Sequence, residues 1–344
     1  MSTADGDLRR AVEEVLLQGP GRWTRQETAE RSGVGPERAT EIWRALGFPV
    51  ADDDARVFTD ADVDALRAGE RLIAAGLITE ESETMMARAL GHHLSRLAEW
   101  QVHTLWSWLL RDLDLPLSEK DLAQHAAALL PEMELLQRHV WRRHLAACAG
   151  RVLTEAAQGA PAGRDQPVRP GEGADVRERA VGFTDMVGYT RLTRGLDSTR
   201  LARVLDRFES LTGDVIADGG GRVVKTIGDE VLYVCESAAA AAGIALELTS
   251  RAVADTELPQ VRTGLAYGPV LGRLGDVYGA AVNIAARLTA VARPGTVLTD
   301  TAFAGELAGR TAYDLKPLRP VSVRGYSRLR PVLLRPAHAH GEAS

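Results

Sequence analysis

The sequence is poor in cysteine and has no long apolar run. Its 344 residues include only two cysteines, Cys148 and Cys235, and both lie in apolar segments. Two cysteines cannot build a disulfide framework, so we expect two buried thiols in a reducing compartment. No segment approaches the roughly eighteen apolar residues that a spanning helix needs, and the first residues lack a signal-peptide pattern. The composition therefore predicts a cytoplasmic protein without a membrane segment.

An excess of positive charge is also absent. The formal net charge is −6 at pH 7 and the isoelectric point is near 5.8, so the chain has no general attraction to nucleic acid or anionic lipid. Hydrophobic residues make up 45% and charged residues 26%, as in soluble globular proteins, and the length allows two domains. Any DNA binding would require a local basic patch.

Tryptophan is missing from the second half of the chain. All six tryptophans and six of the eight histidines precede residue 150, and the other two histidines lie near the C-terminus. This asymmetry indicates two domains with different roles. We predict an all-helical domain over residues 1–149, a Gly- and Pro-rich linker over 150–175, a second domain over 176–335 and a disordered tail over 336–344.

The first 46 residues have the outline of a helix-turn-helix. Thr24 and Glu27 fit a capping box, and the turn Ser32-Gly33-Val34-Gly35 precedes a helix predicted over Pro36–Leu46. This second helix mixes Glu and Arg, whereas phosphate contacts dominate DNA affinity. A packing or dimerisation module is therefore favoured over a DNA-binding one.

Residues 70–145 are predicted to be helical, with breaks near Gly76, Gly91, Pro116 and Pro131. Between Leu90 and Leu110 most turns contribute an apolar residue to one face, which indicates a bundle core or an interface and leaves open an apolar ligand. The histidines of this region could sense pH, since histidine titrates near neutrality, or could have no task. A metal site is the weaker interpretation because no pair shows helical zinc-site spacing. The six histidines of this region are His92, His93, His103, His125, His139 and His144.

The second domain reads as strand, helix, hairpin, helix, strand, followed by further short elements. Strands are predicted over 179–184, 261–266, 296–299, 319–324 and 332–334, and helices over 198–215, 237–252 and 282–291. Lys225-Thr226-Ile227-Gly228-Asp229 lies between two apolar runs and predicts a hairpin with Gly-Asp at its turn. The fold class is α+β, with an antiparallel, ferredoxin-like sheet covered by helices on one face.

Two carboxylates are expected to converge in this domain. Asp185 ends the first strand and precedes a glycine-containing loop, and Asp229 lies at the hairpin tip. In a ferredoxin-like sheet these strands are neighbours, so the carboxylates and the loop could form a magnesium site for a nucleotide. Asn283 and Arg287, four residues apart on one helix face, would offer a carboxamide and a guanidinium.

The motifs FTDMVGYT, KTIGDE and DVYGAAVNIAAR resemble those of class III adenylyl cyclase catalytic domains. The resemblance spans roughly residues 176–334. It implies that Asp185 and Asp229 bind two Mg²⁺ or Mn²⁺ ions in each active site, in which ATP becomes cyclic AMP and pyrophosphate. It further implies that Lys225 and Asp276 read adenine, Asn283 orients the ribose and Arg287 stabilises the transition state. Since the family builds each site from two chains, a homodimer with two composite sites is expected.

Base chemistry agrees with this assignment. Asp276 can accept a hydrogen bond from the adenine amino group and Lys225 can donate one to ring N1, whereas guanine reverses that pattern. Arg324 is the candidate for the cation that contacts the terminal phosphates in the family. The N-terminal half loosely resembles the autoinhibitory, pH-responsive domains that precede such cyclases. The alternative is a catalytically silent regulator that binds nucleotide or DNA.

Overall fold

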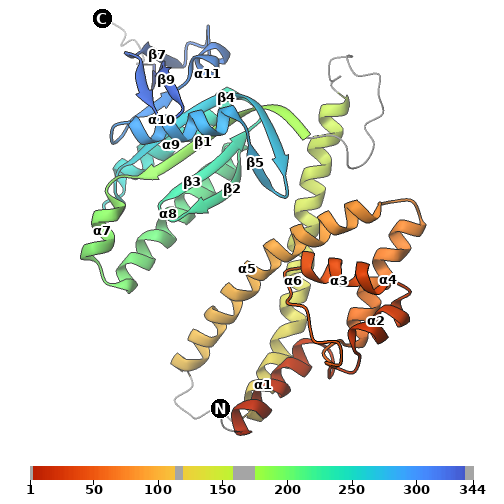
Figure 1. Cartoon of the computed structure of the whole chain (residues 1–344). Coiled ribbons are helices and arrows are strands. Elements are labelled where there is room, and N and C mark those ends of the chain that lie inside the picture. The colour runs from red at the N-terminus through yellow and green to blue at the C-terminus, as the bar shows by residue number, and fades with distance from the viewer. Residues whose placement is uncertain (1–2, 113–118, 158–174, 338–344) are drawn as a thin grey trace, which may run out of the picture. The chain divides into compact units, whose positions relative to one another are not determined.

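The computed structural model describes residues 3–112, 119–157 and 175–337 (Figure 1). The chain divides into two compact units, Met1–Gly173 and Ala174–Ser344. The predicted linker and tail lie largely outside the described residues, although the last helix of the first unit continues past Gly150 to Ala157. None of the described helices is long and apolar enough to span a membrane.

The first unit is helical in its described parts. The Thr24 side chain accepts from the Glu27 N–H and the Glu27 side chain accepts from the Thr24 N–H, which confirms the predicted capping box. Gly33, at a φ of 79°, ends the helix that follows Thr24. The helices are α1 (Thr3–Leu16), α2 (Arg25–Ser32), α3 (Pro36–Ala45), α4 (Asp60–Ala74), α5 (Glu80–Asp112) and α6 (Glu119–Ala157).

Two of the predicted helix breaks are wrong. Helix α5 runs through Gly91 and α6 runs through Pro131. Gly91 marks a close approach, because a Cβ there would lie 2.3 Å from the carbonyl oxygen of Leu46. One proline removes a single backbone donor, which a helix as long as α6 tolerates. The break near Gly76 is confirmed, and Pro116 lies outside the described residues.

Helix α3, the second helix of the helix-turn-helix outline, packs into the first unit. Its Arg38 forms ion pairs with Glu70 of α4 and with Glu83 of α5, and the Arg38 side chain is only 19% exposed. Ala39 and Ile42 of the same helix are buried. These contacts support the packing interpretation, since an arginine committed to two carboxylates is not presented to phosphate.

The second unit is built on a mixed sheet. Its longest path has the order β2-β3-β1-β4-β6-β10-β7, and β5 pairs with β4. The four strands β2, β3, β1 and β4 pair antiparallel in ferredoxin-like order, whereas β4 and β6 are parallel. These strands are β1 (Asp175–Met186), β2 (Arg222–Ile227), β3 (Glu230–Cys235), β4 (Val261–Arg273), β5 (Asp276–Tyr278), β6 (Val297–Thr299), β7 (Tyr313–Pro317) and β10 (Val332–Pro336).

Helices cover both faces of this sheet, which corrects the prediction of helices on one face. Residues of α8 and α9 pack on the face that carries Ala180, Tyr233 and Leu265. Helix α10 packs on the opposite face, against Val181 and Phe183 (Figure 1). The helices are α7 (Tyr189–Gly195), α8 (Ser198–Asp218), α9 (Ala238–Ala254), α10 (Ala280–Val291) and α11 (Thr301–Glu306).

Several short elements were absent from the sequence-based prediction. They include β5, which follows a two-residue turn in which Leu274 and Gly275 both have positive φ. Such a turn matches the twist of paired strands, but Leu274 is an unusual residue for it. A separate two-stranded sheet is formed by β8 (Val321–Val323) and β9 (Tyr326–Leu329).

The cysteines differ in environment. Cys235 is buried in the core of the second unit, as predicted, but Cys148 of α6 is exposed. The prediction for Cys148 was wrong because its apolar neighbours on α6 are themselves largely exposed.

Candidate active site

The two carboxylates predicted to converge lie at one end of the sheet. Strands β1 and β3 pair so that Asp185 is opposite Glu230, the residue after Asp229. The Met186 N–H donates to the Asp229 carbonyl oxygen at 3.0 Å. Ile227 pairs with Glu230, which leaves Gly228 and Asp229 as the two turn residues, with Gly228 at a φ of 63°. The local sequence predicted this turn, and the strand register brings it to Asp185.

This carboxylate end carries concentrated negative charge. Burial, followed by the charge of Asp185, raises the pKa of Asp229. Burial and the charges of Asp185 and Asp229 raise the pKa of Glu230 to about 7. Crowded carboxylates hold protons more tightly because each disfavours the ionised form of the next.

A divalent cation suits this donor set, since hard oxygen ligands are what Mg²⁺ and Mn²⁺ prefer. Among the described residues, no group of three or more His, Cys, Asp or Glu side chains could hold a metal ion. The chain thus offers the pair Asp185 and Asp229, and the nucleotide phosphates and water would complete the coordination.

Arg262 is a site residue that the sequence-based reasoning missed. It lies opposite Asp185 on β4. Its Nε and one terminal nitrogen lie 2.7 and 2.6 Å from the same Asp185 oxygen, Oδ2. The only signal in the sequence was that a charged residue interrupts the apolar run Val261–Ala266. Its partner, Asp185, is 77 positions away, so the sequence did not show the pairing.

Lys225 and Asp276 meet in the structure. Lys225 Nζ lies 2.5 Å from Asp276 Oδ2, and the two side chains are 37% and 27% exposed. The other oxygen, Asp276 Oδ1, accepts from the Val277 N–H at 2.8 Å. The β4–β5 hairpin curves over the sheet so that β5 lies beside β2 (Figure 1). A donor and an acceptor therefore stand side by side at the surface.

Asn283 and Arg287 lie on α10, which is held tightly against the sheet. A Cβ on Gly264 of β4 would lie 2.3 Å from the Ala285 carbonyl oxygen, so only glycine permits this approach. Thr289 Oγ1 donates to the Phe183 carbonyl oxygen at 3.1 Å. Asn283 is exposed and Arg287 half-buried, and within the described residues neither side chain forms a hydrogen bond or an ion pair.

Arg324 occupies the turn between β8 and β9 and is exposed. Val321, Val323 and Tyr326 of this hairpin pack in the cluster that includes Leu288 of α10. The hairpin and the residues on α10 are therefore parts of one packed region, although no described contact joins Arg324 to another candidate residue.

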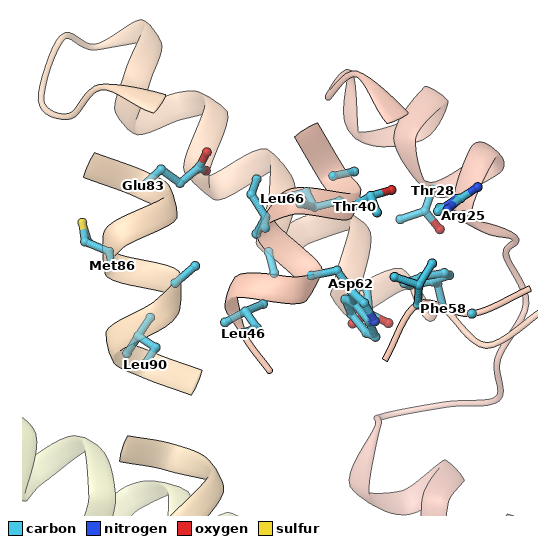
Figure 2. A pocket seen from close by; sticks show the side chains of 18 of the residues that line it. Arg25, Thr28, Thr40, Leu46, Phe58, Asp62, Leu66, Glu83, Met86 and Leu90 are labelled. Carbon is cyan, nitrogen blue, oxygen red and sulfur yellow. The ribbon is translucent and has the colours of Figure 1, made fainter. Parts of the chain in front are cut away.

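The first unit contains an apolar cavity of about 240 Å³. Figure 2 shows side chains from α2, α3, α4, α5 and the segments between them around it, among them Leu46, Phe58, Leu66, Met86 and Leu90. Asp62 and Glu83 are polar residues of the lining. The cavity lies in the domain for which the sequence left an apolar ligand open, but its lining meets the stretch Leu90–Leu110 considered there only at Leu90.

The structure defines an α+β domain that follows a helical domain in the sequence, and comparisons identify the family. Residues 174–335 match the adenylate and guanylate cyclase catalytic domain, and residues 4–144 match the adenylate cyclase regulatory domain. The chain belongs to this nucleotide cyclase family, whose members act on nucleotides and generally use divalent metal ions.

Relatives that match over most of the chain support this assignment. The chain is 37% identical to an adenylate cyclase of Glutamicibacter nicotianae, over 97% of this chain and 84% of that protein. It is 42% identical to an adenylate cyclase of Streptomyces coelicolor, over 87% of this chain and 75% of that protein. It is 32% identical to a protein of Mycobacterium tuberculosis named a pH-sensitive adenylate cyclase, over 79% and 67%.

Proposed function

We propose that this chain is an adenylyl cyclase that converts ATP to 3′,5′-cyclic AMP and pyrophosphate, as a homodimer with two composite sites. The observation that carries the proposal is the contact between Lys225 and Asp276, which presents a donor beside an acceptor. Adenine offers the complementary acceptor at N1 and donor at its amino group. The same pair would leave guanine with unmatched polar groups, which costs about 1–3 kcal/mol for each group.

Each candidate residue has a role in the proposed reaction. Asp185 and Asp229 of one chain would hold two Mg²⁺ or Mn²⁺ ions, which when bound would lower the pKa of the ribose 3′-hydroxyl and neutralise the triphosphate. Asn283 of the other chain orients the ribose. Arg287 faces charge that develops on the α-phosphate in the transition state, so it raises the rate more than substrate affinity. Arg324 contacts the terminal phosphates.

The bonds change in one in-line displacement. The ribose 3′-oxygen gives its proton to solvent water and bonds to the α-phosphorus, while the bond from that phosphorus to the oxygen it shares with the β-phosphate breaks. Pyrophosphate leaves with the bonding electrons. No oxidant or second substrate is needed.

Product analysis tests the proposal. Full-length protein and a fragment that starts at Asp175, the first residue of β1, are each incubated with Mn²⁺-ATP and Mn²⁺-GTP. We expect cyclic AMP from ATP and little cyclic GMP from GTP. If neither form makes a cyclic nucleotide, the proposal fails and the silent nucleotide- or DNA-binding regulator takes its place.

The first unit is proposed to restrain the catalytic unit and to make its activity pH-dependent. The support is the matched regulatory domain, the relative named pH-sensitive, and the exposed histidines of α5 and α6. Activity is expected to rise as pH falls from about 8 to about 6, the range in which histidines gain protons. The fragment should be more active and lack this response, and identical pH profiles for the two forms would contradict it.

The cavity of the first unit is proposed to bind an apolar molecule. Its walls come mostly from hydrophobic side chains, and its volume of about 240 Å³ exceeds that of ordinary packing defects. 1-Octanol should raise the melting temperature of the protein. Ala87→Leu, which fills part of the cavity, should remove the rise in melting temperature. Ala147→Leu, on an exposed part of α6, should keep it. Equal shifts in both variants would exclude this cavity.

A further inference from the structure

Arg262 occupies an unusual position in the second unit. It lies within an apolar strand, yet its side chain is only 31% exposed and contacts the side chain of Asp185, which is 14% exposed. Buried arginines need such partners because an unpaired charge in the interior is costly. The question is what this pairing does beyond satisfying the charge.

Arg262 contacts only one of the two oxygens of the Asp185 carboxylate. A guanidinium often binds both oxygens of a carboxylate in parallel. Here two guanidinium nitrogens converge on Asp185 Oδ2, at 2.7 and 2.6 Å. The guanidinium therefore anchors the carboxylate through Oδ2 and makes no contact with Oδ1.

The third nitrogen of Arg262 reaches α10. It donates to the Ala290 carbonyl oxygen at 3.1 Å, near the C-terminal end of that helix. The close packing of Gly264 and the hydrogen bond from Thr289 hold the same part of α10 against the sheet. One guanidinium thus joins the carboxylate of Asp185 to the helix that carries Asn283 and Arg287.

We infer that Arg262 is a positioning residue, which holds Asp185 by Oδ2 so that Oδ1 faces the metal and which ties this carboxylate to α10. The inference rests on the metal site of the proposed function. In a homodimer with composite sites, the tie runs between the metal ligand of one active site and the α10 residues that serve the other. A lysine supplies the charge but has a single nitrogen and cannot make all three contacts.

Metal binding to the nucleotide-free, full-length protein tests this inference without using activity. Mn²⁺ binding is measured from the loss of the free-ion electron paramagnetic resonance signal. We expect Arg262→Lys and Arg262→Gln each to weaken Mn²⁺ binding about tenfold or more, as seen for residues that orient metal ligands. Arg293→Lys is the matched control, because Arg293 is exposed and lies just beyond α10. It should bind Mn²⁺ as the wild type does.

A double-mutant comparison identifies Asp185 as the group through which Arg262 acts. In an Asp185→Asn background, Arg262→Lys should have no further effect on Mn²⁺ binding. If Arg262→Lys binds Mn²⁺ like the wild type, only the charge matters and positioning is excluded. A full additional loss in the Asp185→Asn background would also overturn the inference.

A measurement on the wild type covers the case in which the variants do not fold. The Nε–H of Arg262 should stay protected from solvent exchange, by nuclear magnetic resonance, as Mg²⁺ is added. Loss of protection would mean that the cation displaces the guanidinium, which contradicts the inference. None of these readouts measures cyclic AMP. An absence of cyclase activity would therefore refute the proposed function without deciding whether Arg262 positions Asp185, and the two failures can be told apart.

Discussion

The two units of the chain differ in how completely they bury their apolar residues. The largest fully buried side chains, among them Tyr233, Phe208 and Phe303, all belong to the second unit. In the first unit, large apolar side chains of α5 and α6 stay exposed in the single chain, with Trp100 at 63% and Leu153 at 70%. The buried residues of the first unit are mostly small, such as Ala29, Ala39 and Ala87.

The two units therefore obtain their stability in different ways. The second unit closes two cores around its sheet, so its fold and the positions of the candidate residues that one chain contributes are set within that chain. The long helices of the first unit leave apolar faces uncovered, as expected for a module that works through contacts with something else. The part of the chain with closed cores is thus distinct from the part with exposed apolar faces.

The largest predicted effect concerns the catalytic residues of the second unit. Asp229→Ala should lower cyclase activity at least 1000-fold, since it loses a metal ligand. Lys225→Ala should lower it about 5- to 150-fold, since it loses a base contact worth about 1–3 kcal/mol. Mixing the two variants should restore activity to about a quarter of the wild-type level, because half of the random dimers hold one intact composite site. Cyclic AMP production by the mixture is the measurement. No recovery, with dimers confirmed by mixed-tag capture, would argue against composite sites.

A core substitution tests the contrast in burial directly. Phe208 is fully buried on α8, so Phe208→Ala should lower the free energy of unfolding by about 3–5 kcal/mol. Trp100→Ala on α5 should change it by less than about 0.5 kcal/mol, since that side chain is exposed in the single chain. Urea denaturation of the full-length protein measures both. A large loss for Trp100→Ala would show that the assembled protein covers the helices.

The two cysteines report on the same contrast. Burial raises the pKa of the Cys235 thiol to about 12, so little thiolate is available for alkylation. Cys148 is exposed. Iodoacetamide at pH 7.5 should label Cys148 at least about 100-fold faster than Cys235, as read by mass spectrometry of peptides. Similar rates for the two thiols would mean that the core of the second unit opens readily.

Helix caps provide the smallest effect, and here the units should behave alike. Asp300 Oδ1 accepts from the Phe303 N–H at 2.8 Å at the start of α11, as Thr24 does at the start of α2. Asp300→Ala and Thr24→Ala should each cost about 1 kcal/mol of stability, measured by urea denaturation. Asp300→Asn keeps the cap and serves as the control.

The cap at Asp300 should also depend on pH. Burial raises the pKa of the Asp300 carboxyl, so the folded state binds its proton more tightly than the unfolded state. Its stabilising contribution is full below the unfolded pKa and is lost as pH rises through the folded value. The stability of the wild type relative to Asp300→Asn should therefore fall as pH rises from about 4. A flat difference would contradict the raised pKa.

Local patterns in the sequence predicted much of the fold. The capping box at Thr24, the Gly228-Asp229 turn and the amphipathic helix beginning at Ser198 each depend on residues a few positions apart, and the structure shows all three. The predictions of helix breaks and of the covered sheet face failed where contacts with residues distant in the sequence set the structure. Gly91 fits inside a helix because the Leu46 backbone packs on it, and α10 was assigned to the wrong face because periodicity does not identify a helix's partner.

The candidate site divides in the same way. The three motifs and the position of Asp229 at a hairpin turn could be predicted from the sequence alone, because these features are encoded within short segments. Only the tertiary structure decided that Lys225 contacts Asp276 and that Arg262 holds Asp185 from 77 positions away. Strand register sets such contacts, and register follows from the packing of the whole sheet rather than from any one strand.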